Sequence, residues 1–131
     1  MPAITAHSRH DLTETEAAVR AALAAQGFGV LTEIDIAATF KAKLDIDRPP
    51  MKILGACNPH LAHQALETDP DAALVLPCNV VLEATERGTA VSAADPHDII
   101  TNPALSVLAD NAADKLRAAL ETVSGEPAQL P

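Results

Sequence analysis

The sequence is poor in aromatic residues: among its 131 residues there are two Phe and no Tyr or Trp. The apolar content still reaches 48%, so the core must be built from aliphatic side chains. Proteins that bind single-stranded nucleic acids stack the bases on aromatic rings, and proteins that bind quaternary ammonium groups enclose them in aromatic cages. This composition excludes both kinds of site. A chain of this length can bury a core without disulfides or a structural metal.

Basic residues are also scarce, with nine Lys and Arg against 18 Asp and Glu, for a net charge of −9. Nucleic acids and anionic membranes both require a basic patch, and we expect neither as a partner. No apolar run approaches the ~20 residues that span a bilayer, and the first ten residues lack the pattern of a signal peptide. We therefore expect a cytoplasmic protein.

Several catalytic motifs are absent, among them the glycine-rich nucleotide loops, G-x-S-x-G and H-E-x-x-H. The sequence thus indicates no nucleotide cofactor, and it favours a binding module over an enzyme. Cysteine is rare as well. Cys57 and Cys78 are the only two, and in the cytosol they are expected to be thiols.

The length of the chain predicts one domain, over residues 1–125. Apolar residues at helical spacing predict helices over residues 12–26, 37–45, 59–68 and 103–123. Alternating or continuous apolar residues predict strands over residues 4–9, 28–36, 51–57, 78–85 and 89–94. The order β-α-β-(α)-β-α-β-β-α is typical of an α+β two-layer sandwich, with helices on one face of a mostly antiparallel or mixed sheet. The strand at 28–36 is expected to be half buried, and residues 126–131 to form a disordered tail.

The two cysteines lie in similar surroundings, Cys57-Asn58-Pro59 and Pro77-Cys78-Asn79. Asn58 is predicted to cap a helix whose first turn holds Pro59, which puts Cys57 at a strand-to-helix corner. Aspartate should replace Asn58 in that role. Pro77 should mark the start of a strand, so Cys78 lies near its beginning. If the two strands are neighbours, both thiols share one end of the sheet.

This arrangement supports two hypotheses. In the first, the dipole of the helix after Cys57 lowers the pKa of its thiol, and Cys57 and Cys78 form a redox pair or bind Cu(I) or Zn with His60 as a further ligand. Asn58 and Asn79, next to the cysteines, are further candidate residues of this ligand-binding or redox site. In the second, the cysteines pack as small hydrophobic residues in a non-catalytic module. The sequence leaves both open.

Four segments together resemble one known family: Gly27-Phe28 after a helix, Cys57-Asn58-Pro59, Leu76-Pro77-Cys78-Asn79-Val80, and Ser92 to Pro96. Over about residues 4–123 the chain resembles the domain of unknown function 302 family, and the paired cysteines resemble one subgroup of it. The resemblance implies a compact single domain and a homodimer. It implies no activity, because the family has none agreed.

Overall fold

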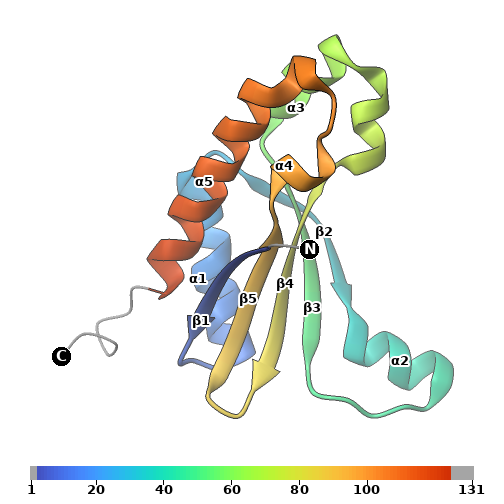
Figure 1. Ribbon diagram of the computed structural model, residues 1–131. Helices are drawn as coiled ribbons and strands as arrows, with labels where there is room; N and C mark the ends of the chain where they lie inside the picture. The colour runs from blue at the N-terminus through green and yellow to red at the C-terminus, as the bar shows by residue number, and fades with distance from the viewer. Residues whose placement is uncertain (1–2, 125–131) are drawn as a thin grey trace.

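The computed structural model describes residues 3–124, which form one sheet with helices packed beside it (Figure 1). The strands are β1 (Ala3–Ser8), β2 (Gly29–Asp35), β3 (Met51–Cys57), β4 (Cys78–Thr85) and β5 (Gly88–Ala94). The helices are α1 (Leu12–Ala25), α2 (Ile36–Leu44), α3 (Pro59–Thr68), α4 (Pro96–Ile99) and α5 (Ser106–Ser124), with short 3₁₀ helices η1 (Pro70–Val75) and η2 (Pro103–Leu105). The predicted α+β order is confirmed. The predicted tail at 126–131 lies outside the described residues.

The sheet has the strand order β1-β5-β4-β3-β2, and every neighbouring pair is antiparallel. Strands β2 to β5 follow one another as a meander, and β1 adds to the far side of β5. β4 and β5 form a hairpin, and β1 lies at one edge of the sheet. Because β3 and β4 are antiparallel neighbours, the end of β3 meets the beginning of β4. Cys57 and Cys78 therefore lie at the same end of the sheet.

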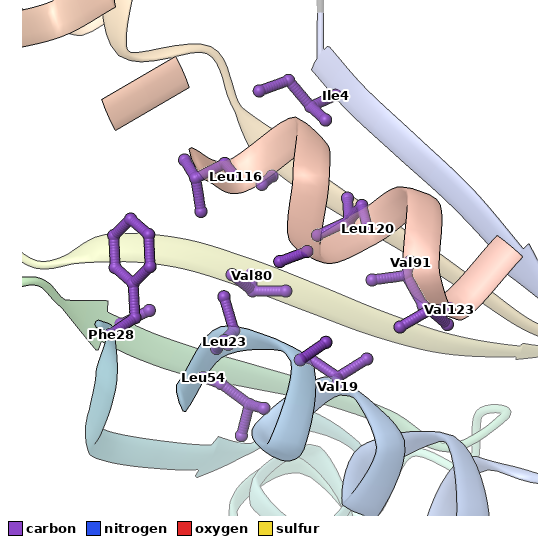
Figure 2. Close-up of a cluster of buried hydrophobic side chains, with 14 of the residues drawn as sticks. Ile4, Val19, Leu23, Phe28, Leu54, Val80, Val91, Leu116, Leu120 and Val123 are labelled. Atoms are coloured by element: carbon purple, nitrogen blue, oxygen red, sulfur yellow. The ribbon is translucent and has the colours of Figure 1, made fainter. Parts of the chain in front are cut away.

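The hydrophobic core lies between α1, α5 and one face of the sheet (Figure 2). Leu23 on α1 and Leu116 and Leu120 on α5 are at most 1% exposed, and they meet Leu54 and Val80 from the two central strands. Aliphatic side chains fill this layer, as the composition requires. Among the described helices, none is long and apolar enough to cross a bilayer.

Strand β2 differs from its prediction, because its side chains are largely exposed rather than half buried. A register shift between Val30 and Thr32 interrupts the alternation on which the prediction depended. Only Val30 packs against the core, while Ile34 is 46% exposed. β2 is also an edge strand, so a neighbour covers it on one side only.

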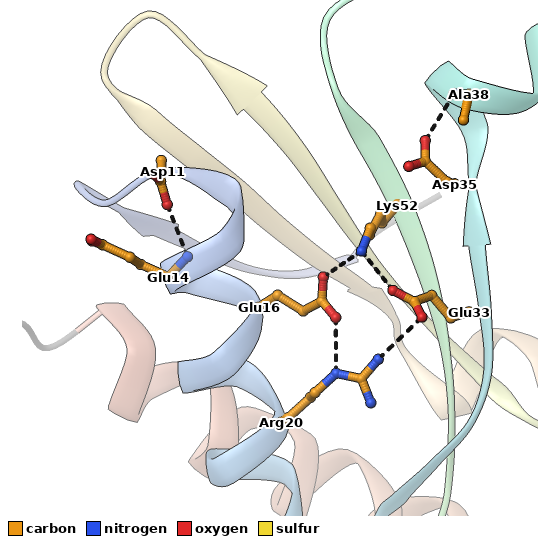
Figure 3. Close-up of polar contacts among 8 residues, drawn as sticks. All are labelled: Asp11, Glu14, Glu16, Arg20, Glu33, Asp35, Ala38 and Lys52. Carbon is orange, nitrogen blue, oxygen red and sulfur yellow. Dashed lines mark hydrogen bonds and ion pairs between the residues drawn. The ribbon is translucent and has the colours of Figure 1, made fainter. Parts of the chain in front are cut away.

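A network of charged side chains ties α1 to β2 and β3 (Figure 3). Lys52 Nζ lies 2.9 Å from Glu16 Oε1 and 2.6 Å from Glu33 Oε1, and Arg20 Nε donates to Glu16 Oε2 over 2.9 Å. Burial alone would raise the pKa of Glu16, but the hydrogen bonds from Lys52 and Arg20 lower it overall. The network closes the side of the core where α1 passes over the sheet.

Candidate functional site

Asn58 begins α3 in the way that the sequence predicts. Its Oδ1 accepts the Leu61 N–H at 3.3 Å, and Pro59 occupies the first turn of the helix. Cys57, as the last residue of β3, therefore lies at a strand-to-helix corner. Asn58 is also 8% exposed, so this polar side chain must find its partners within the protein.

The amide nitrogen of Asn58 makes a second contact that the sequence did not reveal. Nδ2 donates to the carbonyl oxygen of Gln26, at the end of α1, over 3.3 Å. Gly27 follows in a left-handed conformation (φ 85°), and a Cβ there would lie 3.1 Å from Nδ2. The Gly27-Phe28 and Cys57-Asn58-Pro59 segments, 30 residues apart in sequence, thus pack against each other.

Gly55 lies two residues before Cys57 at a point where β2, β3 and the chain before β4 come close together. A Cβ on Gly55 would overlap Oγ1 of Thr32 and lie 2.8 Å from Cγ of Pro77, which follows a cis peptide bond. Only glycine leaves room for both neighbours. The glycine therefore has a packing role.

The two thiols are neighbours that are not bonded to each other. Both cysteines are free; Cys57 is half buried and Cys78 is 5% exposed. The residue directly opposite Cys78 is Ala56, not Cys57. Cys57, Cys78 and Asn58 line one apolar cavity of about 30 Å³, together with Phe28 and Leu61. Since one water molecule occupies about 30 Å³ in the liquid, this cavity is too small for an organic ligand.

Burial raises the pKa of both thiols, and the neighbouring Cys57 raises the pKa of Cys78 further. The hypothesis that the dipole of α3 lowers the pKa of Cys57 is therefore wrong. The cause is burial, which removes the thiol from water, while the N–H of Leu61 is directed to Asn58 rather than to Cys57. A thiol with a raised pKa is a poor nucleophile at neutral pH.

The other predicted site residues lie away from this cavity. His60 is exposed on α3, and Asn79 is exposed on β4, next to the buried Cys78. Between residues 3 and 124 no three His, Cys, Asp or Glu side chains are grouped as ligands for a metal ion. The expected Cu(I) or Zn cluster of Cys57, Cys78 and His60 is therefore not formed, because α3 presents His60 to solvent.

A second polar cluster joins α4 to α5. His97 Nδ1 lies 2.7 Å from Asp95 and its Nε2 lies 2.5 Å from Asp110, while Arg117 donates to Asp95 over 3.0 Å. Hydrogen bonds to Asp110 and Asp95 raise the pKa of His97. The signal in the sequence is Asp95-Pro96, a cap and first-turn proline, but the contact with Asp110 depends on the tertiary structure.

Among the clefts found between residues 3 and 124, one of about 690 Å³ lies at the opposite end of the sheet from the cysteines, beside the start of α1. Sequence reasoning missed it, because its walls come from the ends of several elements. Its charged lining residues are three basic and three acidic: Arg9, Lys52, Arg87, Asp11, Asp35 and Glu86. Such a balanced lining selects neither an anion nor a cation.

Residues 4–123 match the family described as Domain of unknown function DUF302. The chain belongs to this family. A crystal structure of an uncharacterized conserved DUF302 protein from Bacillus stearothermophilus is similar, with a TM-score of 0.85 and 27% sequence identity over 94% of this chain and 98% of that chain. No curated protein matches. Family membership thus accounts for the fold, and it assigns no activity to the DUF302 chain.

Proposed function

We propose that this DUF302 protein is a non-catalytic binding module that works as a homodimer, with its cysteines as packing residues. The interface is the open face, defined as the face of the sheet opposite α1 and α5. In the described part of the chain this face carries no helix over β3, β4 and β5 (Figure 1). This uncovered face is the observation that carries the proposal.

The open face is unusual for so acidic a protein. Strand register and alternation place on it the apolar residues Ile34, Met51, Ile53, Val81, Ala90 and Ala94. Of the described strand residues on this face, Glu83 is the one Asp, Glu, Lys or Arg, and Arg48 pairs with it at 2.8 Å; His7 on β1 lies on the same face. Charged residues make up 21% of the sequence, so the face is depleted in charge. Depletion of charge is typical of the central part of a protein interface.

The surroundings of the thiols support the packing role. Burial raises both pKa values, and the cavity beside them has room for about one water molecule. The side chains that line this cavity pack the junction of β3, α3 and β4, and the space between them does not admit a substrate. Two free thiols also agree with the proposed cytosolic location, where cysteines stay reduced.

Light scattering coupled to gel filtration tests the dimer directly. The wild type should have about twice the 13.6 kDa chain mass at micromolar concentration. Ile34→Lys, on the open face and 46% exposed, should shift the mass toward the monomer. Leu74→Lys is the matched control, since Leu74 is 84% exposed on η1, and it should leave the mass unchanged. A monomeric wild type would refute the proposal.

A second candidate function, soft-metal binding or thiol redox at Cys57 and Cys78, is favoured by one observation. Both cysteines line the same cavity, and the effect of Cys57 on the pKa of Cys78 indicates that the thiols are close. Two thiolates are an adequate set for Cu(I). Titration of the reduced protein with Cu(I) should then give one equivalent bound, and Cys57→Ser and Cys78→Ser should each abolish binding. Unchanged thiol reactivity during the titration would exclude this function.

A further inference from the structure

Another cleft lies at the cysteine end of the sheet, between η1 and the chain that leads from α4 to η2 (Figure 1). Its volume is about 330 Å³, at the lower limit of the pockets that hold small organic molecules. Unlike the cleft beside the start of α1, this one has charged lining residues of one sign only. They are Asp69 and Asp71, and no Lys, Arg or His from the described part of the chain lines it.

The negative charge of these two carboxylates is not compensated by a cation. Asp69 bonds to neutral groups: its Oδ1 accepts the Asp71 N–H at 3.0 Å, and its Oδ2 accepts from Asn102 Nδ2 at 3.1 Å. Asp71 is exposed, and between residues 3 and 124 neither carboxylate forms an ion pair. Since each carboxylate oxygen has two lone pairs, both side chains can still accept hydrogen bonds from a ligand.

The chain around the cleft is acidic as well. Residues 59–75 and 95–114 contain seven Asp and Glu and neither Lys nor Arg. Arg117, further along α5, is already paired with Asp95 and Asp114. The electrostatic field at this end of the molecule therefore attracts cations to the cleft and repels anions.

Most of the remaining lining is aliphatic. Asp71 and Leu74 lie on the same side of η1, because residues three apart are eclipsed in a 3₁₀ helix. Leu74 is 84% exposed and so offers its hydrocarbon surface to a ligand. The other apolar lining residues are partly or fully buried: Ala72, Val75, Ile99, Ile100 and Leu105. The cleft thus places an acidic group beside an aliphatic surface.

We infer that this cleft binds a small aliphatic amine, with its ammonium group on the carboxylates of Asp69 and Asp71 and its hydrocarbon chain against Leu74. A primary ammonium suits the site, because it donates hydrogen bonds that carboxylates accept. A quaternary ammonium does not suit it, because no aromatic ring among the described residues lines the cleft. The site goes beyond the proposed dimer: it shares no residue with the open face, so its test does not depend on association.

Titration of the wild type with hexylamine at neutral pH, followed by two-dimensional amide NMR, tests the site. Amide shifts within residues 69–75 and 99–105 should change and saturate with a Kd on the order of millimolar, as expected for a small probe. Hexan-1-ol, which lacks the charge, and 1,6-diaminohexane, which lacks the apolar end, should each bind about fivefold more weakly. Hexanoate should leave the shifts unchanged. If hexylamine gives no saturable change, or binds no better than hexan-1-ol, the site is refuted.

Three variants locate the binding within the cleft. Asp71→Asn and Leu74→Ser each change an exposed lining residue and should weaken hexylamine binding by about threefold to tenfold. Asp98→Asn is the matched control, because it removes the same charge from an exposed residue of α4 that does not line the cleft. It should bind hexylamine like the wild type. Unchanged binding by Asp71→Asn would overturn the inference, and so would equal weakening in Asp98→Asn, which would show only the general acidity of this end.

Discussion

Asn58 is held by two hydrogen bonds of opposite direction, and this decides which residues can replace it. Its Oδ1 accepts from α3, and its Nδ2 donates to the carbonyl oxygen at the end of α1. The prediction from the sequence considered only the bond that Oδ1 accepts at the start of α3. Aspartate can accept that bond as well as asparagine can. The second bond needs a donor, which a carboxylate lacks. A carboxylate at this buried position would also face the Gln26 carbonyl oxygen.

The first prediction follows from these two bonds. Asn58→Ala should lower the free energy of unfolding by about 1 to 2 kcal/mol, because a cap is lost and a buried carbonyl loses its donor. Asn58→Asp should be destabilised to a similar extent rather than tolerated. Urea denaturation of both variants checks this. An aspartate variant as stable as the wild type would show that the bond to Gln26 contributes nothing.

The second prediction concerns glycines of neighbouring strands that differ in the space around them. Gly55→Ala should destabilise the fold by about 1 to 3 kcal/mol, because its Cβ would collide with Thr32 and Pro77. Gly29→Ala is the matched control in β2, where nothing lies within 4 Å of the added Cβ. It should be neutral or slightly stabilising. Equal melting temperatures for Gly55→Ala and Gly29→Ala would contradict the close packing at Gly55.

At the scale of elements, polar contacts join α4 to α5, beside the buried Pro96. His97 lies between Asp95 of its own segment and Asp110 of α5, and Arg117 of α5 also reaches Asp95. Asp98 on α4 and Asp114 on α5 are the other charged groups of this region, and Asp114 lies 3.7 Å from Arg117. A protonated imidazole fits between two carboxylates. A neutral imidazole would direct an acceptor nitrogen at one of them.

The third prediction is the pH dependence of this link. The pKa of His97 is raised in the folded protein. The contribution of His97 to the free energy of unfolding is therefore complete below the ordinary pKa of 6.5, and it is lost as the pH rises through the raised pKa. The difference in unfolding free energy between wild type and His97→Gln should therefore shrink from pH 6 to pH 9. His60→Gln, at an exposed position on α3, should show no such trend. If the difference in unfolding free energy between wild type and His97→Gln did not change with pH, the charged contacts of His97 with Asp95 and Asp110 would be contradicted.

At the scale of the whole molecule, homodimerisation links stability to protein concentration. If folded chains associate and unfolded chains do not, dilution should lower the melting temperature. For a chain of 131 residues we expect about 2 to 3 °C for each tenfold dilution. Scanning calorimetry over a 100-fold concentration range measures this. Ile34→Lys, on the open face, should melt at a temperature that depends less on concentration. A melting temperature of the wild type that is independent of concentration would argue against the dimer.

Much of the fold was determined by local sequence. The periodicity of α1 and α5 and the cap Asn58-Pro59 each act within a few residues, and the structure confirms both. The same local reasoning ended one strand at Cys57 and began another at Cys78. Because these two strands are antiparallel neighbours, both cysteines lie at one end of the sheet.

The tertiary structure decided what these residues do. Burial, which depends on the whole packed layer, raises the pKa of both thiols and reverses the effect expected from the dipole of α3. The bulge and the edge position of β2 leave exposed a strand that its alternation predicted to be half buried. The contacts of Asn58 with Gln26 and of His97 with Asp110 join segments distant in sequence. Periodicity and capping report the preferences of a segment, whereas exposure and pKa depend on neighbours that only the folded chain brings together.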